Sequence, residues 1–434
     1  MSIEDKLREN AKLHPNKLAL LCNGESYTYG RLYQSVVDKA ASMPEVRGRL
    51  IPIISTSTAD FLISYFAIHL NGGVVVPLHK DIPMQKYEEY SRLLAQGTAP
   101  NGVADILYTT GTTGNAKAVM ISHDAIWANT ENLVCAQGFQ SDLTFIINGP
   151  LNHIGSLSKV YPTIYAGATI CLIDGMKDIR TFFHAIEQAP TKVATFLVPA
   201  AIRMLITLWR NELKDCADKI DFIETGAAPM TASDMELFCK LLPHSRLYNT
   251  YASTETGIIS TYNYNDGECI AGCLGLPMKH SSFFITADGH VACTGDTLMT
   301  GYWHDDVATK AVMTDGVIKT ADIGRIDEQG RLRLQGRGDD IINVGGYKID
   351  PTEIEAAALA YPMVKDCICV CGSHPVAGNV LKLIVVCHED YKQKALIAYL
   401  KTRLESYKLP MMVEVADHIQ RTFNGKLNRK AYRK

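Results

Sequence analysis

The feature that most constrains the fold is an alternation of strand-like and helix-like segments between residues 103 and 242. Short apolar runs alternate there with longer segments of helical periodicity. The predicted strands cover residues 103–107, 145–148, 168–173, 194–198 and 220–224. The predicted helices cover residues 122–139, 156–165, 179–188, 200–210 and 231–242, with Ser122 and Thr231 as N-cap candidates. This alternation predicts a doubly wound α/β sheet of parallel strands, whose ligands bind beyond the carboxyl ends of the strands.

From about Ile259 the pattern changes to short alternating strands separated by turn sequences such as Asp288-Gly289 and Gln329-Gly330. These pairs predict β-hairpins in a barrel-like subdomain. Farther on, an α+β pattern begins with a helix at Thr352. We therefore predict a large N-terminal domain over residues 1–338 and a small, mobile α+β domain over residues 339–434.

The composition is that of an ordinary globular chain. Of the 434 residues 47% are hydrophobic, and 43 Lys and Arg against 46 Asp and Glu leave a net charge of −3, which gives no basic field for nucleic acid. No apolar run is long enough to span a membrane, and the charged N-terminus is unlike a secretory signal. We expect a cytoplasmic protein whose 12 cysteines are reduced thiols.

A loop rich in hydroxyls and glycines follows the first of the predicted strands. It reads Tyr-Thr-Thr-Gly-Thr-Thr-Gly-Asn-Ala-Lys-Ala-Val from Tyr108 to Val119. Glycines let the backbone turn tightly and approach a ligand, while the hydroxyls and Lys117 add donors and a positive charge, a combination that suits a triphosphate. It is not the P-loop of nucleotide hydrolases, because Ala118 stands where that motif has Ser or Thr after the lysine.

This loop resembles the phosphate-binding loop of the adenylate-forming superfamily, which includes acyl- and aryl-CoA ligases, peptide-synthetase adenylation domains and firefly luciferase. The family's loop usually reads Thr-Ser-Gly-Thr-Thr-Gly-x-Pro-Lys-Gly, and Thr110, Ala116 and Ala118 depart from it here. The resemblance implies a set of residues that hold the phosphates of ATP. They are Thr109, Thr110, Gly111, Thr112, Thr113, Gly114 and Lys117.

Two further motifs resemble the family's nucleotide site. Tyr-Ala-Ser-Thr-Glu, which begins at Tyr251, resembles Tyr-Gly-x-Thr-Glu, and implies that Tyr251 stacks near the adenine, Thr254 contacts phosphate and Glu255 holds Mg²⁺. Thr-Ala-Asp ending at Asp322 and Gly-Arg-Gly-Asp containing Arg337 resemble Thr-Gly-Asp and Gly-Arg-x-Asp. They imply that Asp322 accepts hydrogen bonds from the ribose hydroxyls and that Arg337 adds a charged donor.

The segment Glu-Thr-Gly-Ala-Ala-Pro resembles the family's Ser-Gly-Ala-Ala-Pro loop, which covers the adenine and part of the acid pocket. The resemblance places Gly226, Ala227 and Ala228 at the nucleotide, and Thr225 and Gly226 at the acid.

The identity of the acid is addressed by two positions. Pro-Leu-Asn-His, which ends at His153, resembles the Pro-x-x-His of acyl and aryl ligases and implies that His153 lies near the acid's carboxylate. No acidic residue lies between residues 148 and 158, where amino-acid activators of the family carry Asp, so an α-amino acid is disfavoured. Ala252 stands where the family usually has Gly, and its methyl should hinder a long chain, which predicts an aromatic or short-chain acid of the kind used in secondary metabolism.

The C-terminal region also resembles the family. Asp339 falls at the family's interdomain hinge, and Gly345 and Gly346 lie in the loop that approaches the thiol acceptor after domain rotation. Gly-Lys-Leu-Asn-Arg resembles the terminal Gly-Lys-x-x-Arg, whose lysine, here Lys426, enters the site during adenylation.

The resemblance as a whole implies an AMP-forming acid–thiol ligase. The carboxylate attacks the α-phosphate of ATP and displaces pyrophosphate, and the acyl group then passes to a thiol. The acceptor stays open between CoA and the phosphopantetheine arm of an acyl or aryl carrier protein, and the oligomeric state is not indicated. A non-catalytic nucleotide sensor is a remote alternative, against which the retention of Glu255 and Lys426 argues.

Overall fold

The structure is a computed structural model that describes residues 2–109, 117–337, 340, 342–344, 347–374, 378–422 and 427–432. Several predicted site residues therefore lie outside the described residues. They are Thr110, Gly111, Thr112, Thr113, Gly114, Asp339, Gly345, Gly346 and Lys426. The side chain of Arg337 is likewise not described. The predicted boundary between residues 338 and 339 stays a prediction.

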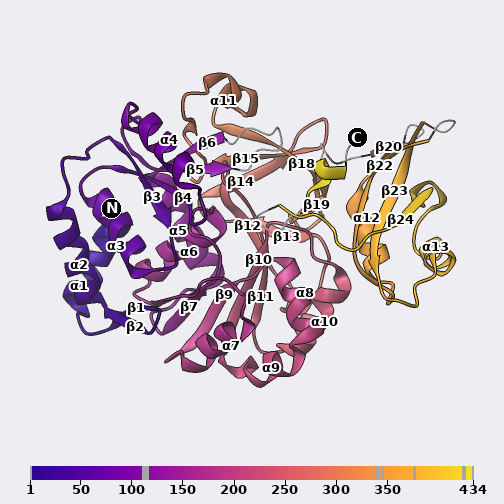
Figure 1. Cartoon of the computed structure of the whole chain (residues 1–434), viewed down its shortest axis with the longest axis horizontal. Coiled ribbons are helices and arrows are strands. Elements are labelled where there is room, and N and C mark those ends of the chain that lie inside the picture. The colour runs from indigo at the N-terminus through magenta and orange to yellow at the C-terminus, as the bar shows by residue number, and fades with distance from the viewer. Residues whose placement is uncertain are drawn as a thin grey trace.

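The largest sheet joins four of the five predicted strands with the predicted hairpins (Figure 1). The prediction is wrong for residues 103–107, which form a strand of a second sheet, because the segment Lys117–Ser122 folds back on them as an antiparallel partner. In spatial order its strands are β14 (Ser281–Ile285), β15 (His290–Gly295), β18 (Val317–Ile326), β19 (Leu332–Arg337), β13 (Cys273–Pro277), β12 (Gly257–Asn263), β11 (Arg246–Ser253), β10 (Ile220–Gly226), β9 (Lys192–Phe196), β7 (Leu143–Ile147), β8 (Thr169–Leu172), β1 (Leu18–Cys22) and β2 (Glu25–Thr28), and β17 (Met313–Thr314) pairs with β18. The sheet is parallel from β11 to β1 and antiparallel from β11 to β14.

Helices cover both faces of the parallel half, as the alternation predicts. Alternate residues of the strands point to opposite faces, so Phe222 belongs to one core and Ile223 to the other. The helices of the first core are α5 (His123–Gln137) and α6 (Ile154–Tyr165), and those of the second are α7 (Ile179–Gln188), α8 (Pro199–Leu208) and α10 (Ala232–Leu241). The side chains of Ser122 and Thr231 cap α5 and α10, as predicted.

The predicted helix over residues 200–210 is wrong at its end. α8 stops at Leu208, and a short helix, α9 (Arg210–Asp215), begins after Trp209, whose φ of −129° and ψ of 36° are not helical. The indole of Trp209 packs against the second core.

A second sheet contains β16 (Gly301–Tyr302), β6 (Lys117–Ser122), β5 (Val103–Thr109), β4 (Val74–His79) and β3 (Leu50–Ser55). The helices of this region are α1 (Ile3–Leu13), α2 (Tyr29–Ser42), α3 (Ala59–Leu70) and α4 (Met84–Ala95). Apolar residues of α3, α5 and α6 pack in one core with residues of both sheets. No helix among the described residues has the length and apolarity that a bilayer crossing would need.

A buried charge network lies in this region. His69 of α3 lies between two carboxylates, with Nδ1 at 2.9 Å from Oε1 of Glu4 and Nε2 at 3.3 Å from Oδ1 of Asp105. The hydroxyls of Tyr65 and Tyr161 donate to Oδ2 of Asp105 at 2.7 and 3.1 Å. Burial opposes the charge of His69, but the two carboxylates raise its pKa to about 10.

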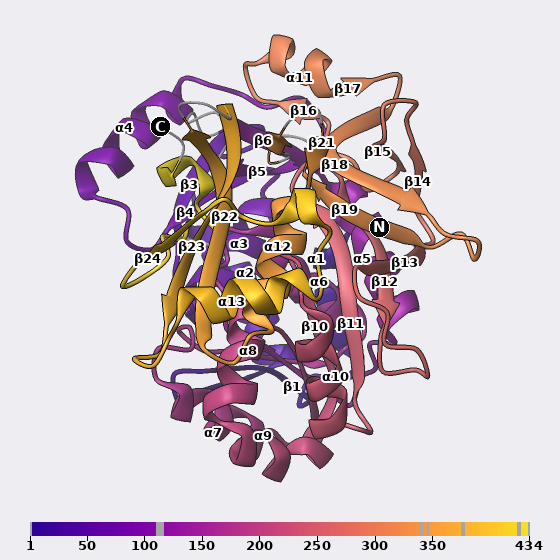
Figure 2. The same ribbon diagram turned by 90° about the vertical axis from the view of Figure 1, so that its right-hand side faces the viewer.

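The C-terminal region is α+β, as predicted, and lies at one end of the long axis of the molecule (Figures 1 and 2). Its sheet contains β22 (Val364–His374), β23 (Gly378–Cys387) and β24 (Met412–Val415), with α12 (Pro351–Leu359) and α13 (Gln393–Lys401) against it. β20 (Ile342–Val344) and β21 (Tyr347–Ile349) pair beside it, and α11 (Asp306–Val312) belongs to the preceding region.

Candidate active site

The carboxyl ends of the parallel strands bring several predicted site residues to one edge of the large sheet. β7, β9, β10 and β11 are successive neighbours. The loop after β7 contains His153, β10 ends at Gly226, and β11 contains Ala252. Because parallel neighbours end at the same edge, the predicted acid-binding residues line a continuous row.

The hairpin of β5 and β6 supports the predicted phosphate loop. Thr109 and Lys117 are cross-strand partners at its open end. The ammonium of Lys117 lies 4.6 Å from the ring centroid of Tyr302, and the hydroxyl of Tyr302 donates to Oε1 of Glu255 at 3.0 Å. A cavity of about 620 Å³ adjoins Lys117 and Tyr302. Tyr302 therefore links the predicted phosphate lysine to the predicted metal ligand.

The phenol of Tyr302 is held in its protonated form. Burial raises the pKa of Tyr302, and the neighbouring Glu255 carboxylate raises it further. Tyr302 is therefore a hydrogen-bond donor to Glu255 across the neutral pH range.

The turn that carries Thr254 and Glu255 leads into Ile258, which a side chain of α5 holds. The side-chain oxygen of Asn129 accepts from the backbone N–H of Ile258 at 2.7 Å, and its amide donates to the carbonyl of Ala125 at 2.8 Å. Gly257 closes the turn with a φ of 68°, and a Cβ there would lie 2.6 Å from the carbonyl oxygen of Thr297. Only glycine fits both the backbone angle and the space.

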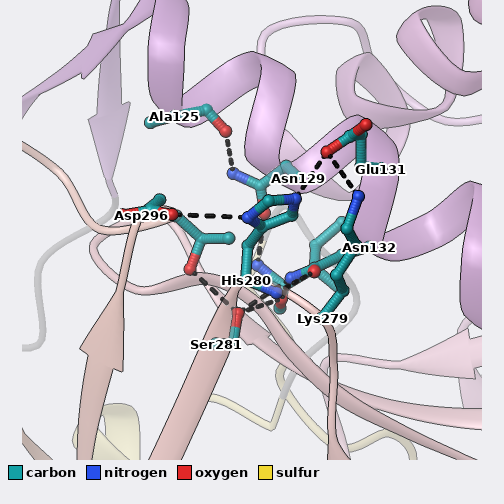
Figure 3. Close-up of polar contacts among 10 residues, drawn as sticks. Ala125, Asn129, Glu131, Asn132, Lys279, His280, Ser281 and Asp296 are labelled. Carbon is teal, nitrogen blue, oxygen red and sulfur yellow. Dashed lines mark hydrogen bonds and ion pairs between the residues drawn. The ribbon is translucent and has the colours of Figure 1, made fainter.

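The same helix also holds the adjoining hairpin (Figure 3). Asn132 accepts from the backbone N–H of His280 at 2.7 Å and donates to Oγ of Ser281 at 2.8 Å. Glu131 contacts Lys279 at 3.0 Å and His280 at 2.5 Å. α5 therefore fixes the turn after β11 relative to β14.

The predicted adenine and ribose residues meet directly. The hydroxyl of Tyr251, which is buried, donates to Oδ2 of Asp322 at 2.7 Å and lies 3.3 Å from Oγ1 of Thr320. Burial raises the pKa of Tyr251, and the carboxylate of Asp322 raises it further. Asp322 and Arg337 are cross-strand partners on β18 and β19, so the two predicted ribose residues are adjacent on the sheet.

The predicted acid loop has a constrained backbone. A Cβ on Gly226 would lie 2.8 Å from the carbonyl oxygen of Thr250, which requires glycine at this approach of β10 to β11. Ala227 follows with a φ of 67°, an unfavourable angle for a residue with a side chain. Ala228 and Thr225 flank this kink, and Thr225 is buried at the end of the strand.

His153 is the N-cap residue of α6 and follows β7. In the sheet, β9 and β10 lie between β7 and β11, the strand that precedes the Glu255 turn. His153 lies in the loop at the carboxyl end of β7, and Gly226 and Ala227 lie at the carboxyl end of β10. We call these two segments, residues 148–153 and 225–228, the acid-side loops.

Sequence reasoning missed three residues near this site. Tyr302 and Asn129 belong to no motif and act through contacts with distant segments. Lys159 of α6 forms a buried ion pair with Glu224 of β10. A signal for Lys159 was present, because it is the only Asp, Glu, Lys or Arg between residues 142 and 174.

Comparisons with known proteins identify the family of the chain. The family described as AMP-binding enzyme matches residues 84–303, and the AMP-binding enzyme C-terminal domain matches residues 353–426. The chain is 31% identical to an indoleacetate–CoA ligase of Aromatoleum aromaticum, over 80% of this chain and 72% of the ligase. It is 25% identical to a 2-succinylbenzoate–CoA ligase of Listeria innocua, over 98% of this chain and 97% of the ligase.

Solved structures share the fold over nearly the whole chain. ATP-bound MatB from Rhodopseudomonas palustris superposes with a TM-score of 0.87 at 23% identity, covering 100% of this chain and 99% of MatB. o-Succinylbenzoate CoA synthetase (MenE) from Bacillus subtilis, in complex with the acyl-adenylate intermediate OSB-AMP, superposes with a TM-score of 0.87 at 22% identity, covering 99% and 98%.

Proposed function

The chain belongs to the AMP-binding enzyme family, and from that premise we propose that it activates a carboxylic acid with ATP and transfers the acyl group to the thiol of CoA. The reaction is that of an AMP-forming acid–thiol ligase. Pyrophosphate leaves in the first step and AMP leaves in the second.

The observation that carries the proposal is the pairing of Tyr251 with Asp322 and of Tyr302 with Glu255 beside Lys117. These contacts bring three groups together around strand β11: the proposed acceptor for the ribose hydroxyls, the proposed cation ligand, and the lysine proposed to donate hydrogen bonds to phosphate. The acid-side loops lie along the same edge, so a bound carboxylate and a bound nucleotide would meet there.

The charges suit the first step. A carboxylate oxygen attacks the α-phosphate, and the bond from that phosphorus to the bridging oxygen of pyrophosphate breaks. Both reactants are anions, so neutralisation and alignment supply most of the catalysis. Lys117 brings positive charge to the phosphates, and Lys426 is proposed to bring a second one from the C-terminal region.

Glu255 suits a hard cation. Its Oε1 accepts from Tyr302, while no described residue makes a hydrogen bond or ion pair with its Oε2. A carboxylate oxygen of this kind is a preferred ligand of Mg²⁺, and Mg²⁺ there would neutralise phosphate charge. A related protein, MenE of Bacillus subtilis, has been solved with ATP and magnesium ion.

The second step needs a rearrangement at the thiol side. We assign the hinge to Asp339 and the thiol-facing loop to Gly345 and Gly346. Rotation there would withdraw Lys426 after adenylation and admit the thiol. CoA is the proposed acceptor because the named relatives are CoA ligases, and a carrier-protein arm is an outcome that the experiment below distinguishes.

The proposed acid is aromatic or short-chain. The relatives include ligases named for 2-succinylbenzoate, indoleacetate and malonate, and also for long-chain fatty acids. Ala252 lies at a bulge between β11 and β12, where its methyl would stand in the way of an extended chain. This argument favours the compact acids.

Pyrophosphate release tests the proposal. The purified chain is incubated with ATP, Mg²⁺ and single acids, with CoA, with a phosphopantetheinylated carrier protein or with neither. We expect release with at least one compact acid and thioester formation with CoA. Thioester formation on the carrier protein alone would favour the carrier-loading alternative over a CoA ligase. ATP binding without pyrophosphate release for any acid would favour the nucleotide sensor.

A further inference from the structure

The buried ion pair between α6 and β10 has no role in the reaction described above. Lys159 and Glu224 are 2% and 1% exposed, and Nζ lies 2.8 Å from Oε1 and 2.7 Å from Oε2. Burying two charges is unfavourable unless their hydrogen bonds are satisfied, so an interior pair calls for an explanation.

The pair lies below the acid-side loops. Lys159 follows the N-cap residue His153 by six positions, which is about 9 Å along a helix. Glu224 precedes Gly226 by two positions, about 7 Å along a strand. Because His153 and Gly226 lie at the carboxyl edge of the sheet, both charged groups lie at a similar depth beneath it.

An aromatic ring lies next to the pair, and two glycines lie against that ring. The ammonium of Lys159 lies 5.6 Å from the ring centroid of Phe196. A Cβ on Gly155 or on Gly226 would lie 3.6 or 3.7 Å from the same ring. Gly155 and Lys159 are four residues apart and therefore share one face of α6. The ring of Phe196 therefore lies next to the ammonium of Lys159 and also adjoins both glycines.

The polar atoms of the pair have unused hydrogen-bonding capacity. An ammonium has three N–H donors, and within the described part of the chain the acceptors near Nζ are the two oxygens of Glu224. Oε2 of Glu224 is buried and receives no well-aligned hydrogen bond from any described residue. One atom placed against the pair could therefore accept from Lys159 and donate to Glu224.

The charge balance decides which group fits. Lys159 and Glu224 together are neutral, so a second carboxylate or an ammonium on the ligand would leave a net charge in the interior. A hydroxyl is neutral, and it both donates and accepts. Burial lowers the pKa of Lys159, and the neighbouring Glu224 carboxylate offsets this only in part.

We propose that Lys159 and Glu224 form the floor of the acid pocket and select an aromatic acid that carries a hydroxyl at the end opposite its carboxyl group. The inference rests on the function proposed above. The hydroxyl donates to Oε2 of Glu224 and accepts from Nζ of Lys159, while the ring packs against Phe196 and the carboxylate lies at the level of His153.

Matched acids test the proposal through kcat/KM for pyrophosphate release. The pairs are benzoate with 4-hydroxybenzoate, phenylacetate with 4-hydroxyphenylacetate, and 3-phenylpropanoate with 3-(4-hydroxyphenyl)propanoate, with terephthalate as a dicarboxylate. In the parent we expect a preference of at least about tenfold for the hydroxylated member of one pair, since an unmet buried polar group discriminates strongly. Preference for the unsubstituted acid or for the dicarboxylate would overturn the proposal.

The double variant Lys159→Met, Glu224→Gln separates recognition from packing. Replacing a buried ion pair with neutral groups of similar size often preserves stability, and cooperative unfolding verifies the fold. The ratio of kcat/KM for the hydroxylated acid to that for the unsubstituted acid should fall toward one. An unchanged preference in the folded double variant would overturn the proposal.

The matched control is Arg203→Met, Asp234→Asn, which removes an ion pair between α8 and α10 on the opposite face of the sheet. The hydroxyl preference should not change in it. The parent ratios alone decide the matter if the double variant does not fold. If no acid gave pyrophosphate release, the function proposed above would be contradicted. Pyrophosphate release without any preference for the hydroxylated acids would contradict only the role proposed for Lys159 and Glu224.

Discussion

At the scale of single residues, the contact between Tyr251 and Asp322 would determine how the proposed site holds its nucleotide. A carboxylate has two oxygens, and Oδ2 of Asp322 already accepts from the buried phenol. The phenol thereby orients the carboxylate. In the proposed site the ribose hydroxyls would meet a fixed acceptor, which would lower the entropic cost of binding.

Replacing Asp322 with Asn should therefore weaken ATP binding more than it slows the bound reaction. Hydrogen bonds to a charged group contribute about 1.5–3 kcal/mol, so the KM for ATP should rise roughly 10- to 100-fold. Steady-state pyrophosphate release at varied ATP measures it. Tyr251→Phe is the companion variant, with a smaller rise, and an unchanged KM in Asp322→Asn would remove Asp322 from the nucleotide site.

Tyr302→Phe should leave Glu255 less well oriented and should therefore weaken the binding of Mg²⁺. The variant loses the hydrogen bond at Oε1 but keeps the ring under Lys117. We expect the Mg²⁺ concentration at half-maximal rate to rise several-fold, with a thermal midpoint close to the parent's. A Mg²⁺ titration at saturating ATP measures it, and a titration curve identical to the parent's would separate Tyr302 from the metal.

The sequence indicated some of these residues and not others for a physical reason. Asp322, Glu255 and Lys117 sit in local motifs, because the chemistry of phosphate and ribose dictates side-chain type and spacing. Tyr302 lies 47 residues from Glu255 along the chain, and Lys159 lies 65 from Glu224. Such pairs are set by tertiary packing, which no local pattern encodes.

At the scale of elements, α5 acts on the reaction through the turn after β11. The turn contains Thr254 and Glu255, and α5 fixes it through Asn129 and through the close packing at Gly257. A change in this support should move Glu255 without altering any residue that touches a substrate.

Gly257→Ala should therefore reduce kcat at least about tenfold and destabilise the fold by about 1–3 kcal/mol. Its Cβ would collide with the carbonyl of Thr297 and with Asn129. Gly267→Ala is the matched control, because Gly267 has a φ of 88° but nothing within 4 Å of a Cβ. Initial rates and urea unfolding measure both variants. Equal effects in the two would assign the loss to backbone strain and not to the support of Glu255.

Element types were predictable from periodicity, but element order in space was not. The apolar runs at residues 145–148 and 220–224 became β7 and β10, since a buried strand needs only its own apolar residues. The addition of β1 and β2 beyond β8 depends on contacts across more than a hundred residues. The break at Trp209 was missed because the apolar periodicity continues through it.

At the scale of the whole molecule, the charge network around His69 makes stability depend on pH. The pKa of His69 is raised to about 10 in the folded chain from about 6.5 in the unfolded chain, so its contribution is complete below pH 6.5 and lost as the pH rises to 10. In this window the free energy of unfolding should fall by up to about 1.4 kcal/mol per pH unit.

Urea unfolding at pH 6.5, 7.5, 8.5 and 9.5 measures this loss, with Glu4→Gln as the comparison. Removing one carboxylate lowers the pKa of folded His69, so the variant should stop losing stability at a lower pH than the parent. The difference between the two profiles is the readout, because the buried cysteines titrate equally in both. Superimposable slopes would contradict the prediction.

The two halves of the proposed reaction should separate at Lys426. Lys426→Ala should abolish acyl-adenylate formation but spare thioester formation from a preformed adenylate, because Lys426 is assigned to the first step alone. Pyrophosphate exchange and thioester assays measure the two steps. Lys408→Ala, which removes a lysine paired with Glu353, should affect neither step. Exchange at the parent rate in Lys426→Ala would show the assignment to be wrong.

The position of β11 has a consequence for how such a chain diverges in evolution. The parallel strands on one side of β11 end in the acid-side loops, while the antiparallel strands on the other side carry Asp322 and Arg337. Substitutions at the Lys159 and Glu224 positions can therefore change the acid without disturbing the groups that read ATP. Descendants of one ancestor can acquire new substrates in small mutational steps, and selection can act on each half separately.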